Sequence, residues 1–171
     1  MSALPRVFAC LLLLPAFVSA ALADDRWQSQ PEGPVILTVT GPLGCCPEGV
    51  ALFDQARLDA LPQTQVKTLT PWTEQVDTFE GVSIRDLLVQ LQASGRFIEA
   101  KALNDYHTRF EVQTVLDYPV ILATRKNGEP MPVRNKGPIW IIYPLSDFPP
   151  LRKELHHQAM VWQLKSLTIV E

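Results

Sequence analysis

Two stretches of sequence decide the fold of this chain of 171 residues. Residues 102–144 read ALNDYHTRFEVQTVLDYPVILATRKNGEPMPVRNKGPIWIIYP, and residues 79–88 read FEGVSIRDLL. Within the first stretch, residues 120–125 are mostly apolar and precede Asn127-Gly128, the strongest two-residue signal for a β-hairpin. Residues 139–143 are almost wholly apolar, which predicts a central strand. The longer stretch therefore predicts the core of a β-sheet.

The shorter stretch predicts the start of a helix. The hydroxyl of Ser83 can accept the free N–H three residues on, Asp86 stands where a reciprocal capping partner belongs, and Gly95 provides a stop. Apolar residues at helical spacing predict a second helix over residues 50–61. A third short helix is expected at residues 149–157, and a single turn at 115–118. The remaining predicted strands cover residues 35–40, 64–70, 75–79, 100–103, 109–112 and 160–170.

These elements predict one α+β domain, mostly β, with two or three short helices, over residues 35–171. Residues 24–34 are polar and contain prolines, so they read as an extended lead-in. Near its start the chain has Arg6, then a short apolar run, then the triplet that ends at Ala23. This order is typical of a secretory signal peptide, which we place over residues 1–23. We expect cleavage after Ala23 and a soluble, exported, periplasmic protein. No later segment has the length and hydrophobicity of a membrane span.

Charge and cysteine content narrow the possible functions. Without residues 1–23 the chain has 14 Lys and Arg against 18 Asp and Glu, a formal charge of −4. It has no basic block, so nucleic acid is not an expected partner. Cys45 and Cys46 are adjacent, and they can be two buried thiols, a vicinal disulfide or redox pair, or a metal or intermolecular site. The sequence alone leaves these alternatives open.

Five ordered motifs carry a resemblance to a known family. They are FEGVSIRDLL (79–88), ALNDY (102–106), PVILATRKNGEPM (119–131), VRNKGPIWIIYP (133–144) and VWQL (161–164). Together they resemble the molybdopterin-binding domain of the sulfite oxidase family, from about Val35 to the C-terminus. The resemblance implies that fold in a short, stand-alone form. It also implies a cysteine ligand to molybdenum just before residue 79, at a position that here falls near Thr68 or Thr70.

The sequence therefore predicts the scaffold of this family without its metal ligand. A threonine hydroxyl is a poor ligand for molybdenum, whereas a thiolate is a strong one. We accordingly expect no metal site and no cofactor, although the resemblance allows molybdopterin. The candidate residues for binding an anion or cofactor lie in the motifs and in the turn before residue 79: Thr70, Trp72, Asn104, Asp105, Tyr106, His107, Arg134 and Lys136.

Three functions follow from these residues. The favoured one is a binding, accessory or sensor module for a small anion, held in a pocket formed by Trp72, Tyr106, Arg134 and Lys136. The second is a periplasmic molybdopterin-dependent oxidoreductase with unusual ligation. It would use Arg134 and Lys136 on the pterin phosphate and need a membrane, haem or signalling partner. The third is a thiol-redox or metal-handling protein that uses Cys45 and Cys46.

Overall fold

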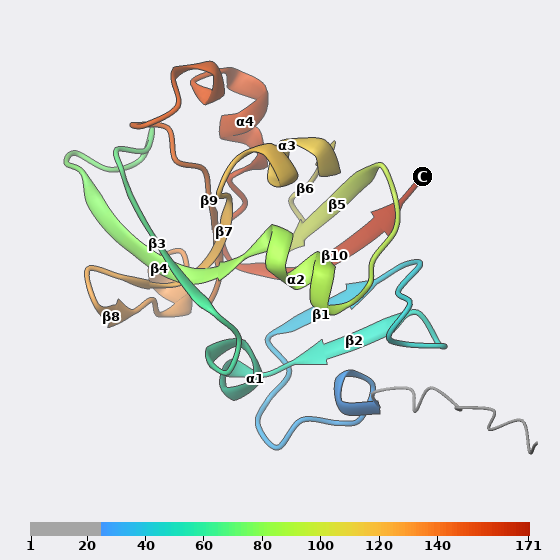
Figure 1. Cartoon of the computed structure of the whole chain (residues 1–171). Helices are drawn as coiled ribbons and strands as arrows, with labels where there is room; N and C mark the ends of the chain where they lie inside the picture. The colour runs from blue at the N-terminus through green and yellow to red at the C-terminus, as the bar shows by residue number, and fades with distance from the viewer. Residues whose placement is uncertain (1–24) are drawn as a thin grey trace, which may run out of the picture.

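Two five-stranded sheets organise the chain in the computed structural model, which describes residues 25–171 (Figure 1). The first sheet has the order β2-β1-β10-β5-β6. Its strands are β1 (Leu37–Thr40), β2 (Val50–Phe53), β5 (Phe97–Ala102), β6 (His107–Glu111) and β10 (Leu164–Val170). Strand β10 runs parallel to β1 and antiparallel to β5, and the other pairs are antiparallel. The last strand of the chain therefore lies at the centre of this sheet.

The second sheet has the order β3-β4-β7-β8, and β9 also pairs with β7. Its strands are β3 (Gln63–Thr68), β4 (Asp77–Ser83), β7 (Ile121–Lys126), β8 (Glu129–Pro130) and β9 (Trp140–Ile142). The predicted hairpin turn is confirmed, with Asn127 at φ +52° and Gly128 at φ +84° between β7 and β8. A tight turn needs such positive φ values, which Asn and Gly tolerate best.

The prediction that residues 139–143 form a central strand is wrong in one respect. β9 is wholly buried, but it pairs with β7 alone and lies at an edge of the second sheet. Its other side is covered by the segment before β10, where the Ile141 amide donates to the Val161 carbonyl at 2.9 Å. Burial by this segment, rather than a second neighbouring strand, explains why β9 is apolar throughout.

Residues 25–171 also contain four α-helices and three short 3₁₀ helices. The α-helices are α1 (Gln55–Asp59), α2 (Ile84–Gln90), α3 (Val112–Asp117) and α4 (Glu154–Ala159), and the 3₁₀ helices are η1 (Asp25–Trp27), η2 (Val133–Asn135) and η3 (Pro149–Leu151). Ser83 caps α2 as predicted, with its hydroxyl accepting the Asp86 amide, but the helix ends at Gln90, before the expected stop. The single turn expected at 115–118 is a short helix, α3, that starts earlier.

The prediction of one helix over residues 50–61 is wrong. Residues 50–53 form β2, whose side chains alternate between half-buried and buried positions as it pairs with β1. Asp54 then begins α1, because its carboxylate accepts the Arg57 amide at 2.8 Å. A side-chain cap of this kind fixes where a helix starts. Pairing with β1 decides the conformation of the preceding four residues, which the apolar spacing alone could not reveal.

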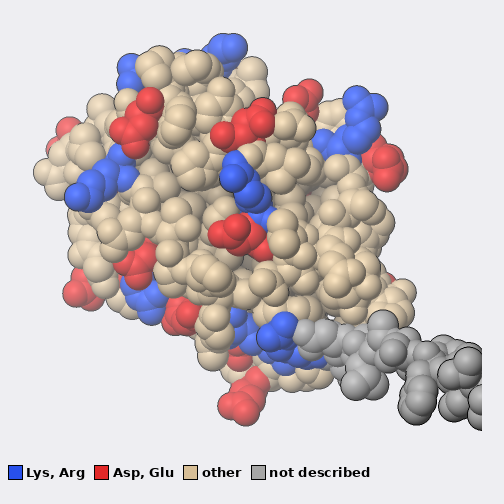
Figure 2. Space-filling model, in the orientation of Figure 1, with Lys and Arg blue, Asp and Glu red and all other residues tan. Residues whose placement is uncertain are grey.

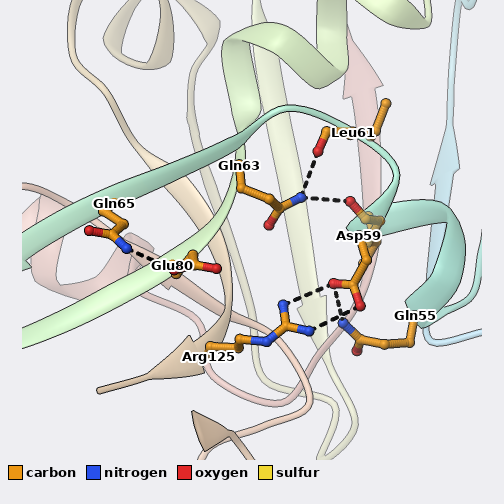
Figure 3. A network of polar contacts seen from close by, with 8 residues as sticks. Gln55, Asp59, Leu61, Gln63, Gln65, Glu80 and Arg125 are labelled. Atoms are coloured by element: carbon orange, nitrogen blue, oxygen red, sulfur yellow. Dashed lines mark hydrogen bonds and ion pairs between the residues drawn. The ribbon is translucent and has the colours of Figure 1, made fainter. Parts of the chain in front are cut away.

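A polar network ties α1 to the second sheet (Figure 3). Arg125 on β7 donates to both carboxylate oxygens of Asp59, at 3.0 and 3.1 Å, and Gln55 donates to the same carboxylate. Gln63 at the start of β3 donates to the carbonyls of Leu58 and Leu61. Both sheets contribute to one continuous hydrophobic core, which also includes the inner faces of α2 and α3.

Two predictions concern the N-terminal part of the chain: a signal peptide and an extended lead-in, and the lead-in is not extended throughout. The signal peptide over residues 1–23 lies outside the described residues. Residues 25–34 contain η1, and Trp27 packs into the core against Phe53 at a centroid distance of 5.0 Å. Among the helices of residues 25–171, none is both long enough and apolar enough to cross a membrane.

Candidate ligand pocket

A pocket of about 200 Å³ lies where α4 meets the turn between β3 and β4 and the turn between β5 and β6. Its lining comes from three separate parts of the sequence: Trp72, Ala102, Asn104, Tyr106, Glu154, His157, Gln158, Met160, Val161 and Trp162. Three of these ten residues are aromatic, and one, Glu154, is acidic. None is Lys or Arg. The pocket is therefore an aromatic cavity with a carboxylate among its lining groups.

Two tryptophans form one corner of the pocket. The rings of Trp72 and Trp162 are 5.1 Å apart between centroids and nearly perpendicular, at 82°. Trp140 lies behind both, at 6.1 and 6.4 Å, and its indole N–H donates to the Met160 carbonyl at 3.0 Å. Since Trp140 is buried, it gives this corner a fixed support.

Trp72 is held in place by a short turn after β3. The hydroxyl of Thr70 accepts the Trp72 amide at 3.3 Å, and the Thr73 hydroxyl accepts the Thr70 amide at 3.0 Å. Thr70 is buried, whereas Trp72 keeps 39% of its surface exposed. Thr70 thus positions the tryptophan and does not itself line the pocket.

The opposite side of the pocket is formed by the ALNDY motif and α4. The Asn104 side-chain oxygen accepts the Tyr106 amide at 3.2 Å. The Tyr106 hydroxyl donates to the carbonyl of Gln158 at 3.0 Å, which joins this turn to α4. The polar end of Tyr106 is therefore already bonded, and its ring is the part that remains for a ligand.

Some of the candidate residues named from the sequence lie at this pocket. Trp72, Asn104 and Tyr106 line this pocket together, and Thr70 supports it. Lys136, at φ +66°, places its ammonium 4.7 Å from the ring centroid of Trp162 and 5.5 Å from that of Trp140. It touches a wall of the pocket without being part of the lining.

The other three candidates lie elsewhere. Arg134 is exposed on η2. Asp105 forms ion pairs with Lys101 at 2.9 Å and Lys165 at 3.4 Å, and these cations lower the pKa of its carboxyl. His107 starts β6 and lines a different, open hollow on the first sheet, beside Arg109 and Thr168. The structure therefore brings half of the predicted set together.

Sequence reasoning missed the contribution of α4. Glu154, His157 and Gln158 follow one another at spacings of three and four residues, which places them on one face of a helix. The carboxylate of Glu154 accepts a hydrogen bond from the side-chain amide of Gln158 at 3.3 Å and lies 3.9 Å from Nδ1 of His157. The spacing of Glu154 and His157 was visible within the predicted helix 149–157, and Gln158 lies one residue beyond it. Only the tertiary structure shows that this face meets Trp72 and Tyr106.

The residues near the family's metal position do not fit molybdenum ligation. Residues 67–72 contain no cysteine. Thr68 is fully buried, and its hydroxyl bonds to the Leu69 carbonyl and accepts the Ser146 amide at 3.0 Å. The Thr70 hydroxyl is bonded within its turn, at 3.2 Å from the Thr73 hydroxyl. Both hydroxyls thus have structural partners, and a neutral hydroxyl is a weak ligand beside a thiolate.

The two cysteines of residues 25–171 lie in another part of the fold. Cys45 and Cys46 are joined in a vicinal disulfide in the loop between β1 and β2, and both are buried. The Cys45 amide donates to the Leu91 carbonyl at the C-cap of α2, and neither cysteine is among the residues that line the pocket. Within residues 25–171, no group of three or more His, Cys, Asp or Glu is arranged to hold a metal ion.

Comparisons with known proteins agree with the fold. The family model described as the oxidoreductase molybdopterin binding domain matches residues 55–146, more than half of the chain, so the chain belongs to this family. The match includes Trp72, Asn104 and Tyr106 but ends before α4.

Among solved structures, the chain is similar to the sulfane dehydrogenase SoxCD from Paracoccus pantotrophus. The TM-score is 0.59 at 18% sequence identity, over 78% of this chain and 37% of the other. This likeness confirms the predicted fold class, and the chain spans little more than a third of that protein. No curated protein matches the sequence.

Proposed function

We propose that this protein is a ligand-binding accessory or sensor module built on the molybdopterin-binding fold, and that it does not use molybdenum chemistry. The observation that carries the proposal is the pocket of Trp72, Tyr106 and Trp162. It combines apolar walls with a few polar groups, as small-molecule sites do. The bonded hydroxyls of Thr68 and Thr70 support the second half of the proposal.

A small anion is not the ligand that the lining of this pocket favours. The prediction of an anion relied on Arg134 and Lys136 facing Trp72 and Tyr106, and neither cation is among the lining residues. On the face shown in Figure 2, basic and acidic side chains alternate without a broad positive area. Of the two predicted cations, Lys136 is the one that lies next to the pocket, beside Trp162, where it could hold an anion. We keep anions in the test for that reason.

The second candidate is a molybdopterin-dependent oxidoreductase, and family membership is the observation in its favour. In that case Arg134 and Lys136 would contact the pterin phosphate, and the protein would need a redox partner. Under either function we propose export to the periplasm through residues 1–23, where a membrane or signalling partner would meet the protein.

Elemental analysis separates the two functions. The protein is purified from a host that makes molybdopterin, and a known molybdopterin enzyme produced in the same host serves as the control. We expect well below one molybdenum per chain in folded, monodisperse protein. A stoichiometric amount would overturn the proposal and require a search for an unexpected ligand, beginning with Thr70.

A thermal-shift screen tests binding directly. Cationic, neutral and anionic small molecules are compared on the wild-type protein and on Trp72→Ala. We expect at least one class to raise the melting temperature of the wild type and to lose that effect in the variant. Val76→Ala is the matched control, because Val76 is an exposed apolar residue just before β4 that does not line the pocket.

A further inference from the structure

We propose that the pocket binds an organic cation, a small ammonium compound held by the aromatic rings and by the carboxylate of Glu154. This inference rests on the proposed binding function and names the ligand class that the pocket selects.

Three rings line the cavity together. The planes of Trp72 and Trp162 are nearly perpendicular, at 82°, and Tyr106 lines the same cavity. The face of an aromatic ring carries negative charge density, and it attracts a cation within about 6 Å of the centroid. Several ring faces around one small cavity form the aromatic cage that recognises quaternary ammonium groups.

Lys136 shows that the ring of Trp162 accepts a cation in this fold. Its ammonium lies 4.7 Å from the ring centroid. Lys136 is not part of the lining, so its ammonium lies beside the pocket and not within it. The ammonium of Lys136 also repels a second cation nearby, and the Lys136→Met variant tests this repulsion.

The polar groups of the lining differ in charge. Asn104 and Tyr106 bond to backbone groups, the first to an amide and the second to a carbonyl. Glu154 is the one carboxylate of the lining; it accepts the Gln158 side-chain amide and lies 3.9 Å from Nδ1 of His157, and its side chain is 79% exposed. The ten lining residues contain neither Lys nor Arg, so the pocket contains a negative group without a fixed positive one. An ammonium compound complements this charge, whereas an anion would face Glu154.

The size of the pocket also fits a small ammonium compound. The volume of about 200 Å³ accommodates a small compound such as tetramethylammonium or choline, and it lies below the range of sites that hold drug-sized ligands. The apolar lining by Met160, Val161 and Ala102 suits methyl groups around a charged nitrogen. A small methylated ammonium compound therefore matches the pocket in shape, polarity and charge.

Isothermal titration with three probes tests the ligand class. The probes are choline, its neutral carbon isostere dimethylbutanol, and sodium sulfite. We expect choline to bind with a Kd of about 1 mM or tighter, and the neutral isostere to bind about tenfold more weakly, a factor that lies between the cation–π attraction of exposed sites and that of desolvated sites.

Variants assign the effect to the pocket. Trp72→Ala is expected to weaken choline binding about tenfold or more, Trp72→Phe to restore part of it, and Glu154→Gln to weaken it about threefold. Glu129→Gln is the matched control, since Glu129 is an exposed acid in the β7–β8 hairpin. Lys136→Met should leave choline binding equal or tighter, because it removes a competing cation.

The outcomes separate the two proposals. Equal affinity for choline and dimethylbutanol, or Trp72-dependent binding of sulfite instead, would overturn the ligand class and leave the binding module intact. If no probe binds and the wider thermal-shift screen finds no Trp72-dependent ligand, both proposals fail. A loss of choline binding in Glu129→Gln equal to that in Glu154→Gln would overturn the assignment to this pocket.

Discussion

His156 and Tyr143 are neighbouring core residues whose polar atoms lack a hydrogen-bond partner within residues 25–171. The rings are 5.5 Å apart, and the unpaired atoms are Nδ1 of His156 and the Tyr143 hydroxyl. Burial raises the pKa of Tyr143 and lowers the pKa of His156, which the charges of Lys153 and His157 lower further. His156 is therefore neutral in the folded protein near pH 7.

This depressed pKa makes stability depend on pH. The unfolded chain binds a proton on His156 near pH 6.5, whereas the folded protein does so only at lower pH. The free energy of unfolding should therefore fall as pH decreases from about 6.5 toward the folded-state pKa of His156. We expect His156→Phe to remove this part of the slope, as measured by urea denaturation between pH 7 and pH 5.

An exposed histidine provides the control for this measurement. His107→Phe changes a residue at the surface of β6, and it should leave the slope unchanged. A wild-type slope that persists in His156→Phe would show that other groups cause the pH dependence.

At the scale of elements, a single ion pair joins α1 to β7. The Arg125–Asp59 pair is bidentate, and the hydrogen bond from Arg125 lowers the pKa of the Asp59 carboxyl. Both side chains are about one-third exposed, so solvent screens the pair. A double-mutant cycle with Asp59→Ala and Arg125→Ala should give a coupling free energy of about 0.5–1 kcal/mol at pH 7.

The same cycle should depend on pH in the direction that a depressed acid pKa requires. The contribution of Asp59 is present above its unfolded pKa, near 3.9, and is lost as pH falls through the lower folded value. A coupling free energy that is zero at pH 7, or that grows on acidification, would contradict the assignment of this pair as a link between α1 and β7.

Gly81 controls the contact between β4 and β7. A register shift separates Glu80 from Gly81 in this pairing, and a Cβ atom on Gly81 would overlap the backbone carbonyl of Leu122. Backbone atoms cannot move away cheaply at the centre of a sheet. We expect Gly81→Ala to lower the free energy of unfolding by about 1–3 kcal/mol, as overpacking does, in a urea titration. Gly128→Ala tests position-dependence, because nothing lies within 4 Å of a Cβ there and only its φ of +84° opposes the change.

At the scale of the whole molecule, β10, the last strand, pairs with β1, the first strand. It lies between β1 and β5, and its buried residues Leu164, Leu167 and Ile169 belong to the core. Deletion of residues 164–171 should therefore abolish the cooperative thermal transition seen by circular dichroism. Deletion of Glu171 alone, which lies outside the strand, is the control and should preserve it. A cooperative transition in the longer deletion would mean that the first sheet forms without its central strand.

Much of this molecule could be predicted from local sequence. The hairpin at Asn127-Gly128 and the cap at Ser83 depend on side chains within a few residues, so their chemistry is readable without the fold. The motifs from residue 79 to residue 164 also sufficed to indicate the family. The helix expected at residues 50–61 failed because pairing with β1, a contact outside the local sequence, outweighed the apolar spacing.

The sequence by itself thus determined the class of fold, most element types and the residues Trp72, Asn104 and Tyr106 as site candidates. Only the tertiary structure decided that α4 completes their pocket and that Arg134 lies outside it. Trp72 and Trp162 are 90 positions apart in the numbering, yet their rings are 5.1 Å apart. The physical reason is that a pocket is formed by packing between residues far apart in the sequence. Local propensity and spacing carry no information about such packing.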